Sequence, residues 1–201
     1  MTVRHTHQPY AGAILTLPNI LTLGRILLVV AMVGTYYMKG DSARWLAVGI
    51  FAVAGITDFF DGYLARAWAQ QSRLGQMLDP IADKLLVAAA LILITAWHTA
   101  SGLTVIPVVV ILSREILVSG LREFLANASV SVPVTLLAKW KTTMQMLALG
   151  FLLAGPAGEK VIPHTVLIGE AGLWIAAILT FYTGFDYFRA GFRHILDENG
   201  R

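Results

Sequence analysis

Long apolar segments alternate with short polar ones along the chain. Six of these segments read as membrane-crossing helices. They comprise residues 20–38, 45–64, 77–97, 103–126, 141–154 and 166–187. Turn-forming and charged residues separate them, at residues 39–42, 70–73, around 101–102, 127–133 and 155–158. The pattern predicts an all-α, polytopic membrane protein with six transmembrane helices and a polar cavity open to the cytoplasmic side.

The composition supports a membrane protein. Of the 201 residues, 57% are hydrophobic and 13% are charged, and the mean hydropathy is +0.70. Six spans of about 20 residues leave room only for short connections, so we expect one membrane domain over residues 1–201. Cysteine is absent, which excludes disulfides, thiolate metal sites and cysteine nucleophiles. The net charge of +3 is too small to make nucleic acid the expected partner.

Lysine and arginine are unevenly divided between the two alternating sets of connections. One set holds ten of them: Arg4, Arg66, Arg73, Lys84, Arg122, Lys139, Lys141, Arg189, Arg193 and Arg201. The other holds three: Lys39, Arg44 and Lys160. The positive-inside rule therefore predicts a multi-pass protein of the bacterial inner membrane with both termini cytoplasmic. We expect no removable signal peptide, and residues 1–18 are a candidate segment for the membrane surface.

Four aspartates gather at the cytoplasmic ends of the second and third segments. Asp58 and Asp61 are three positions apart, and Asp79 and Asp83 are four apart, so each pair lies on one helix face. Carboxylates without His or Cys suit Mg²⁺ or Mn²⁺, and four of them can hold two ions. Isolated pairs would more often be solvated helix caps. Four acids at helical spacings around one loop favour a metal site.

Small residues and an arginine lie among these acids. Gly62 follows Asp61, and Gly75 precedes Asp79 by four positions. A missing side chain lets a phosphate approach the backbone, and Arg66 offers a fork of donors to a diphosphate. Alone, Gly62 would be an ordinary packing residue and Arg66 an interfacial anchor. Their placement among the acids makes them candidates for substrate binding.

Residues 58–83 read Asp58-x2-Asp61-Gly62-x2-Ala65-Arg66-x8-Gly75-x3-Asp79-x3-Asp83. This string resembles the signature of the CDP-alcohol phosphatidyltransferase family at every position and in both gap lengths. The resemblance implies a six-helix fold, a homodimer, a CDP-linked substrate and two bound metal ions. It implies that the first three acids bind the metals with help from Asp83, which deprotonates the acceptor hydroxyl. It also implies that the CDP moiety is contacted by Asp58, Asp61, Gly62, Ala65, Arg66 and Gly75.

Basic residues in the later segments indicate a phosphorylated acceptor. Arg114 interrupts the fourth segment, where an arginine is costly unless it faces a wet cavity or a partner. Lys139 and Lys141 begin the fifth segment, and Arg189 follows the sixth. Together these cations could surround the acids and bind a phosphate dianion. Two alternatives stay open: a packing contact between Arg114 and Glu115, and snorkelling of the other side chains at the interface.

Three further stretches resemble the bacterial phosphatidylglycerophosphate synthase branch of the family. They are residues 18–25, 113–126 and 139–146, reading Pro-Asn-Ile-Leu-Thr-x2-Arg, Ser-Arg-Glu-Ile-Leu-Val-Ser-Gly-Leu-Arg-Glu-Phe-Leu-Ala and Lys-Trp-Lys-Thr-Thr-x-Gln-Met. The resemblance implies CDP-diacylglycerol and sn-glycerol 3-phosphate as substrates, within membrane lipid. Inositol phosphate, serine or phosphatidylglycerol are alternative acceptors. An ion-coupled transporter is a further alternative, although the acids cluster at one membrane face and no repeated half is visible.

The first segment carries a polar face of its own. Asn19, Thr22 and Arg25 fall at one-turn spacings, and an arginine in an otherwise apolar helix needs a polar partner. One reading is direct substrate contact, by Asn19 and Thr22 with CDP and by Arg25 with the acceptor phosphate. The other is helix capping together with an ion pair to the acids. The sequence favours neither.

Overall fold

The computed structural model describes residues 17–67, 73–127 and 136–199, which are almost entirely helical. The elements are α1 (Leu17–Gly34), the 3₁₀ helix η1 (Thr35–Tyr37), α2 (Asp41–Ala67), α3 (Arg73–Ala96), the 3₁₀ helix η2 (Gly102–Thr104), α4 (Val105–Asn127), α5 (Leu136–Glu159) and α6 (Thr165–Asn199). Each predicted segment contains a helix, which confirms the all-α prediction. The predicted surface segment falls almost wholly outside the described residues.

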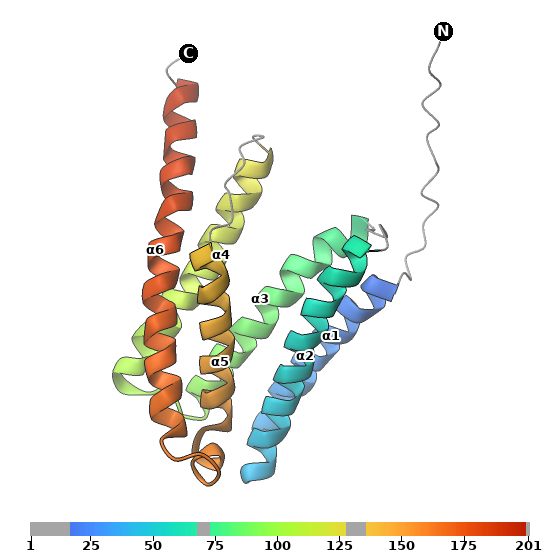
Figure 1. The fold of residues 1–201 in the computed structure, drawn as a ribbon, viewed down its shortest axis with the longest axis vertical. Coiled ribbons are helices and arrows are strands. Elements are labelled where there is room, and N and C mark those ends of the chain that lie inside the picture. The colour runs from blue at the N-terminus through green and yellow to red at the C-terminus, as the bar shows by residue number, and fades with distance from the viewer. Residues whose placement is uncertain (1–16, 68–72, 128–135, 200–201) are drawn as a thin grey trace.

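The helices form two groups joined by α3 (Figure 1). α1 packs against α2 and α3, whereas α6 packs against both α4 and α5. α3 also contacts α4 and α5, and α2 meets α5 across the middle of the molecule. Successive helices alternate in direction, so the start of α1, the end of α2, the start of α3 and the end of α6 point toward the same end of the molecule (Figure 1).

The break predicted at residues 155–158 is present as a kink in α5. Gly155 is non-helical, with φ 49° and ψ −131°, and the chain then returns to helical geometry up to Glu159. Glycine adopts this positive φ without penalty, and Pro156 suits the first position of the turn that follows. α6 runs 35 residues to Asn199, well past the expected end at residue 187. That is about 50 Å of helix, longer than the ~30 Å hydrocarbon core of a bilayer.

The core lies where α3 and α5 meet their neighbours. Leu91 and Ile94 of α3 and Leu149 and Leu152 of α5 are fully buried. α5 and α6 approach each other closely because Gly172 has no side chain. A Cβ at that position would lie 3.0 Å from the Cβ of Ala148. A small residue at this crossing therefore permits the close packing of the two helices.

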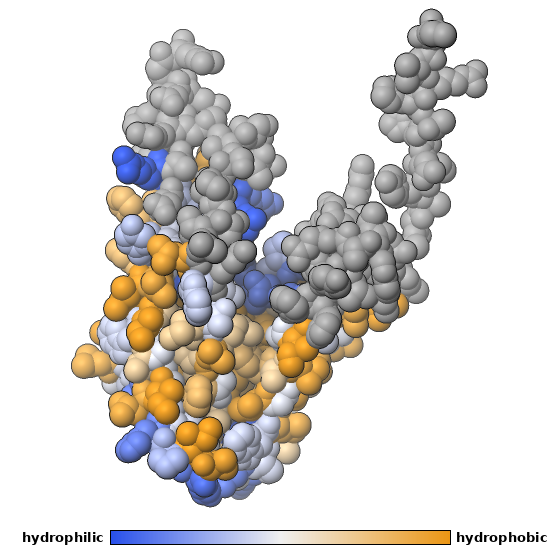
Figure 2. Space-filling model, in the orientation of Figure 1, coloured by the Kyte–Doolittle hydropathy of each residue, from blue (hydrophilic) through white to orange (hydrophobic). Residues whose placement is uncertain are grey.

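The outer surface is also rich in large apolar side chains. Leu27 of α1 and Phe181 of α6, for example, are 70% and 73% exposed. Figure 2 shows such side chains along the flanks, with hydrophilic ones at the lower end and in the recess between the helix groups. Within the part of the chain that the structure describes, three stretches are long and apolar enough to cross a membrane: Asn19–Tyr37, Gly102–Leu125 and Thr165–Arg189. α2, α3 and α5 carry more charge, and their spanning stays a prediction.

Arg44 of α2 connects α2 to the end of α3 and to α5, at the end of the molecule opposite the aspartates. Its guanidinium donates to Thr99 Oγ1 at 2.8 Å and to the carbonyl oxygens of Leu153 at 3.4 Å and Trp97 at 3.5 Å. It also lies 4.8 Å from the centre of a ring of Trp97. A side chain at Gly155 would collide with this guanidinium. Arg44 thus satisfies carbonyls at the end of α3 and at the kink of α5.

Candidate active site

The polar face of α1 contacts aspartates of two other helices. Asn19, Thr22 and Arg25 are each at most 1% exposed. Arg25 Nη1 forms an ion pair with Asp58 Oδ1 of α2. Thr22 Oγ1 donates a hydrogen bond to Asp79 Oδ1 of α3 at 2.6 Å. Of the two readings of this face, the ion pair is present in the structure, whereas substrate contact by these three residues stays a prediction.

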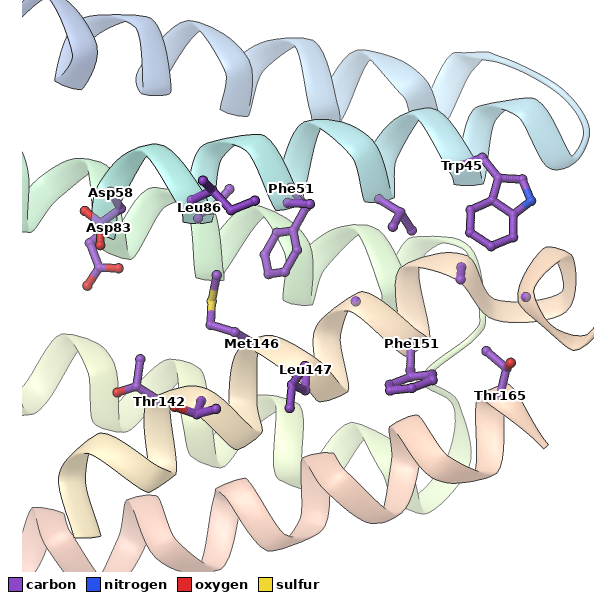
Figure 3. Close-up of a pocket in the computed structure, with 18 of the residues that line it drawn as sticks. Trp45, Phe51, Asp58, Asp83, Leu86, Thr142, Met146, Leu147, Phe151 and Thr165 are labelled. Atoms are coloured by element: carbon purple, nitrogen blue, oxygen red, sulfur yellow. The ribbon is translucent and has the colours of Figure 1, made fainter. Parts of the chain in front are cut away.

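Asp58 and Asp83 come together from α2 and α3. Both line the same pocket, and each lies within electrostatic range of the other, so that their negative charges repel. Figure 3 shows the two carboxylates side by side at one end of this pocket. Asp79 lies one turn before Asp83 on α3. The predicted meeting of the second and third segments is therefore seen for the acids that the structure describes.

Asp61 and its neighbours lie outside the described side chains. Asp61, Gly62, Ala65 and Arg66 belong to the last turns of α2, where only the backbone is described, and Lys139 of α5 is in the same situation. Gly75 is buried near the start of α3. Within the described part of the chain, no three acids or histidines converge on one point. The four-acid cage and the CDP contacts of these residues stay predictions.

The available donors nevertheless suit a hard divalent cation. Asp58 and Asp83 present carboxylate oxygens at the pocket end, and Asp58 is 44% exposed even though Arg25 takes one of its oxygens. A cation between the two carboxylates would relieve their repulsion. Mg²⁺ and Mn²⁺ prefer such oxygen ligands and keep several bound waters, which leaves room for a substrate phosphate.

The pocket extends from these acids as a long apolar groove between α2 and α5. Its volume is about 670 Å³. Phe51 of α2 and Met146, Leu147 and Phe151 of α5 line its length, and Trp45 lies at the far end (Figure 3). At 1.5 Å per residue, the groove follows α2 for about 20 Å. With a divalent cation between Asp58 and Asp83, its shape and polarity would suit a molecule with an anionic head and a long apolar tail.

Two threonines on α5 contribute to the pocket wall and were not singled out from the sequence. Thr142 and Thr143 line the pocket, and Figure 3 shows Thr142 on the side opposite Asp58 and Asp83. Both belong to the stretch 139–146 that resembles the synthase branch. That stretch was the available signal, but apolar periodicity alone gives no reason to choose a threonine beside two lysines.

A second polar cluster forms around Glu115 of α4. Its Oε1 lies 2.5 Å from Lys141 Nζ of α5 and 3.2 Å from Arg114 Nη1, and its Oε2 lies 3.6 Å from Lys84 Nζ of α3. Arg114 Nη2 also donates to Thr183 Oγ1 of α6 at 3.2 Å. We call Lys84, Arg114, Glu115 and Lys141 the Glu115 cluster. It ties α3, α4, α5 and α6 together at the depth of the aspartates.

The Glu115 cluster adjoins the acid-lined end of the pocket. Asp83 precedes Lys84 on α3 and lies within electrostatic range of both Lys84 and Glu115. The predicted cations Arg114 and Lys141 are thus brought together near Asp83. Both hold a carboxylate here, so their contact with an acceptor phosphate stays a prediction, as does that of Arg189, which is exposed on α6. Sequence reasoning left Lys84 and Glu115 out of the site.

Comparison with known proteins extends the likeness far beyond the signature. The family model for CDP-alcohol phosphatidyltransferase matches residues 15–182. The CDP-diacylglycerol–glycerol-3-phosphate 3-phosphatidyltransferase of Rickettsia bellii is 50% identical over 174 residues, which cover 87% of this chain and 94% of that protein. The enzyme of the same name from Cereibacter sphaeroides is 41% identical over 91% of this chain and 98% of its own. That from Pectobacterium atrosepticum is 42% identical, with coverages of 90% and 97%.

Proposed function

The chain belongs to the CDP-alcohol phosphatidyltransferase family, and we propose that it transfers the phosphatidyl group of CDP-diacylglycerol to sn-glycerol 3-phosphate, yielding phosphatidylglycerophosphate and CMP. The observation that carries this proposal is the 40–50% identity to relatives named for that reaction, over nearly their whole length. The prediction of the family from residues 58–83 is confirmed by the family match.

The pocket supports CDP-diacylglycerol as the donor. Its polar end would take the diphosphate, and its apolar groove between α2 and α5 would take an acyl chain entering sideways from the membrane. The signature residues Gly62, Ala65, Arg66 and Gly75, with Asn19 and Thr22 of α1, would contact the CDP moiety. Because the groove is apolar along its length and charged at one end, the lipid would bind in one direction only.

The aspartates supply the metal site and the base. Asp58, Asp61, Asp79 and Asp83 would hold two Mg²⁺ or Mn²⁺ ions, which would offset the negative charge of the diphosphate and of the departing CMP. Asp83 accepts the proton of the 1-hydroxyl of glycerol 3-phosphate. The hydroxyl oxygen forms a bond to the phosphorus that bears diacylglycerol, and the bond from that phosphorus to CMP breaks. Arg25 fixes the carboxylate of Asp58 beside this reaction.

The cations would bind the phosphate of the acceptor. Arg114 and Lys141 lie near Asp83 through the Glu115 cluster, so they could hold a phosphate while the free hydroxyl points toward Asp83. Lys139, Arg189 and Arg25 are the further residues that we assign to this task. Serine lacks a phosphate, and the phosphate of phosphatidylglycerol is a diester with a single negative charge. Neither would pair with this group of cations as well as a phosphate monoester.

We place the protein in the bacterial inner membrane as a homodimer, with six spans and both termini cytoplasmic. The exposed apolar flanks support the membrane setting. The distribution of lysine and arginine supports the orientation, with the aspartates and the polar cavity on the cytoplasmic side. Family resemblance supports the dimer.

An acceptor panel tests the proposed reaction. Purified protein is incubated with CDP-diacylglycerol, Mg²⁺ and one of four acceptors: sn-glycerol 3-phosphate, inositol phosphate, serine or phosphatidylglycerol. Mass spectrometry then identifies the lipid formed. We expect phosphatidylglycerophosphate and CMP in equal amounts with the first acceptor only. A product with another acceptor, or none with glycerol 3-phosphate, would contradict the proposal.

A further inference from the structure

Glu115 is surrounded by cations from three helices, and neither the signature nor the predicted cation set gives it a role. Its side chain is 13% exposed, and those of Lys141 and Arg114 are 7% and 15% exposed. Lys84, on the side of the aspartates, is the most accessible member at 31%. All three ion pairs converge on a single carboxylate near Asp83, which lines the acidic end of the pocket.

One carboxylate does not neutralise three cations. The four residues of the Glu115 cluster carry a formal charge of +2, which the single negative charge of nearby Asp83 offsets only in part, and excess charge is costly in poorly hydrated surroundings. A phosphate monoester carries close to two negative charges at neutral pH. The excess charge of the cluster therefore matches the phosphate that the proposed acceptor carries.

Buried polar atoms without hydrogen-bond partners lie within one turn of the Glu115 cluster or of its contact Thr183. Among the described residues, Arg114 Nε, Gln145 Oε1 and Thr180 Oγ1 are buried and have no hydrogen-bond partner. Gln145 lies one turn after Lys141, and Thr180 lies one turn before Thr183, which accepts a bond from Arg114. Buried polar atoms are normally satisfied, so these mark hydrogen-bonding capacity left for a polar ligand or water.

We infer that Glu115 is a placeholder for the acceptor phosphate: it holds Lys84, Arg114 and Lys141 around one point, and the incoming phosphate competes with it for them. This inference rests on the proposed function. In this role Glu115 is a positioning residue that touches no reacting atom. A weakly charged molecule competes poorly with the tethered carboxylate, whereas a dianion can displace it, which selects phosphorylated acceptors.

Variants that change only the charge of Glu115 distinguish competition with phosphate from a purely structural link between helices. Glu115→Gln keeps the size and an acceptor oxygen but removes the competing charge, and Glu115→Asp keeps the charge. Glu170→Gln is the matched control, because Glu170 of α6 accepts a bond from Thr104 Oγ1 at 2.9 Å and also links two helices. Inorganic phosphate, titrated calorimetrically into purified protein in detergent, is the probe.

We expect Glu115→Gln to bind inorganic phosphate about tenfold more tightly than the wild type, the effect of one modest charge–charge interaction. Glu115→Asp and Glu170→Gln should stay within about twofold of the wild type. In turnover assays, the KM for glycerol 3-phosphate should fall in Glu115→Gln while the KM for CDP-diacylglycerol stays the same. Unchanged or weaker phosphate binding by a folded Glu115→Gln protein would overturn the inference.

A second variant covers the case in which Glu115→Gln does not fold. Lys84→Gln alters the most exposed member of the cluster and lowers its excess charge from +2 to +1. Phosphate binding should weaken about tenfold by the same electrostatic reasoning. Equal phosphate affinity in the wild type and Lys84→Gln would contradict the competition.

Separate results would contradict the proposed reaction and the placeholder role of Glu115. If the wild type makes no lipid from glycerol 3-phosphate but Glu115→Gln tightens phosphate binding, the proposed acceptor is wrong and the placeholder role stands. If the wild type makes phosphatidylglycerophosphate but binds phosphate with the same affinity as Glu115→Gln, the reaction stands and the placeholder role is wrong.

Discussion

Arg25 of α1 is paired with Asp58 of α2, and the two partners differ sharply in exposure. The side chain of Arg25 is 1% exposed, whereas that of Asp58 is 44% exposed and faces the pocket. The pair therefore fixes one carboxylate oxygen in the interior and leaves the rest of the group accessible. A buried cation thus holds in place one of the acids that we assign to metal binding.

This pair predicts different stabilities for two isosteric variants. Asp58→Asn removes the charge that Arg25 pairs with and should lower the free energy of unfolding by about 1 kcal/mol, less than for a fully buried pair because Asp58 is 44% exposed. Asp83→Asn removes a charge that repels Asp58 and should leave stability equal or higher. Thermal unfolding of the purified variants in detergent measures the difference. Equal melting temperatures for the two variants would show that the pair contributes little.

Asp83 should be essential for turnover but not for binding of the donor. Asp83→Asn removes the proposed proton acceptor, so kcat should fall about a thousandfold. At saturating Mg²⁺, which compensates for the lost metal ligand, binding of CDP-diacylglycerol should persist because the remaining acids and the groove are unchanged. Radiolabelled glycerol 3-phosphate measures product formation. A near-normal rate would rule out Asp83 as the base.

The groove offers a test of donor binding at Gly150 of α5. A Cβ built on Gly150 has nothing within 4 Å, and this residue lines the groove. Gly150→Leu should therefore fill the groove without a clash and raise the KM for CDP-diacylglycerol, with little effect on that for glycerol 3-phosphate. Gly49→Leu is the control, since Gly49 of α2 also has open space but does not line the groove. An unchanged donor KM in Gly150→Leu would contradict acyl-chain binding there.

The cations should affect the acceptor more than the donor. Arg114→Ala or Lys141→Ala should lower kcat/KM for glycerol 3-phosphate. The loss of transition-state stabilisation should be about 2 kcal/mol, with a smaller change in donor binding. Arg44→Gln is the control, because Arg44 makes polar contacts at the opposite end of the molecule. It should lower stability and leave both KM values unchanged. Equal weakening of both substrates in Arg114→Ala would argue against a phosphate site.

Local periodicity was enough to predict much of the site. The spacings of Asp58, Asp79 and Asp83 fix which helix faces carry the acids, and the one-turn spacing of Thr22 and Arg25 fixes a third face. Because a buried arginine needs a charged partner, the ion pair to an acid followed as one of two readings. These inferences depend on helix geometry alone, and the structure places the residues accordingly.

Features set by contacts between helices were harder to predict. Glu115 looked like a local partner of Arg114, and its contacts with Lys84 and Lys141 depend on how α3, α4 and α5 pack. Glycine followed by proline indicates a break at residues 155–156, and Gly155 is indeed non-helical. The sequence does not indicate that Arg44 fills the space beside Gly155, or that the chain returns to helical geometry after the kink.

The proposed reaction requires divalent cations bound by the aspartates of α2 and α3. Titration of Mn²⁺ into purified protein, followed by electron paramagnetic resonance of the free ion, measures this binding without turnover. We predict saturable binding in the wild type that weakens at least about tenfold in Asp58→Asn and in Asp83→Asn, because each loses a charged oxygen ligand. Mn²⁺ binding that is absent in the wild type, or that is the same in all three proteins, would contradict the metal site.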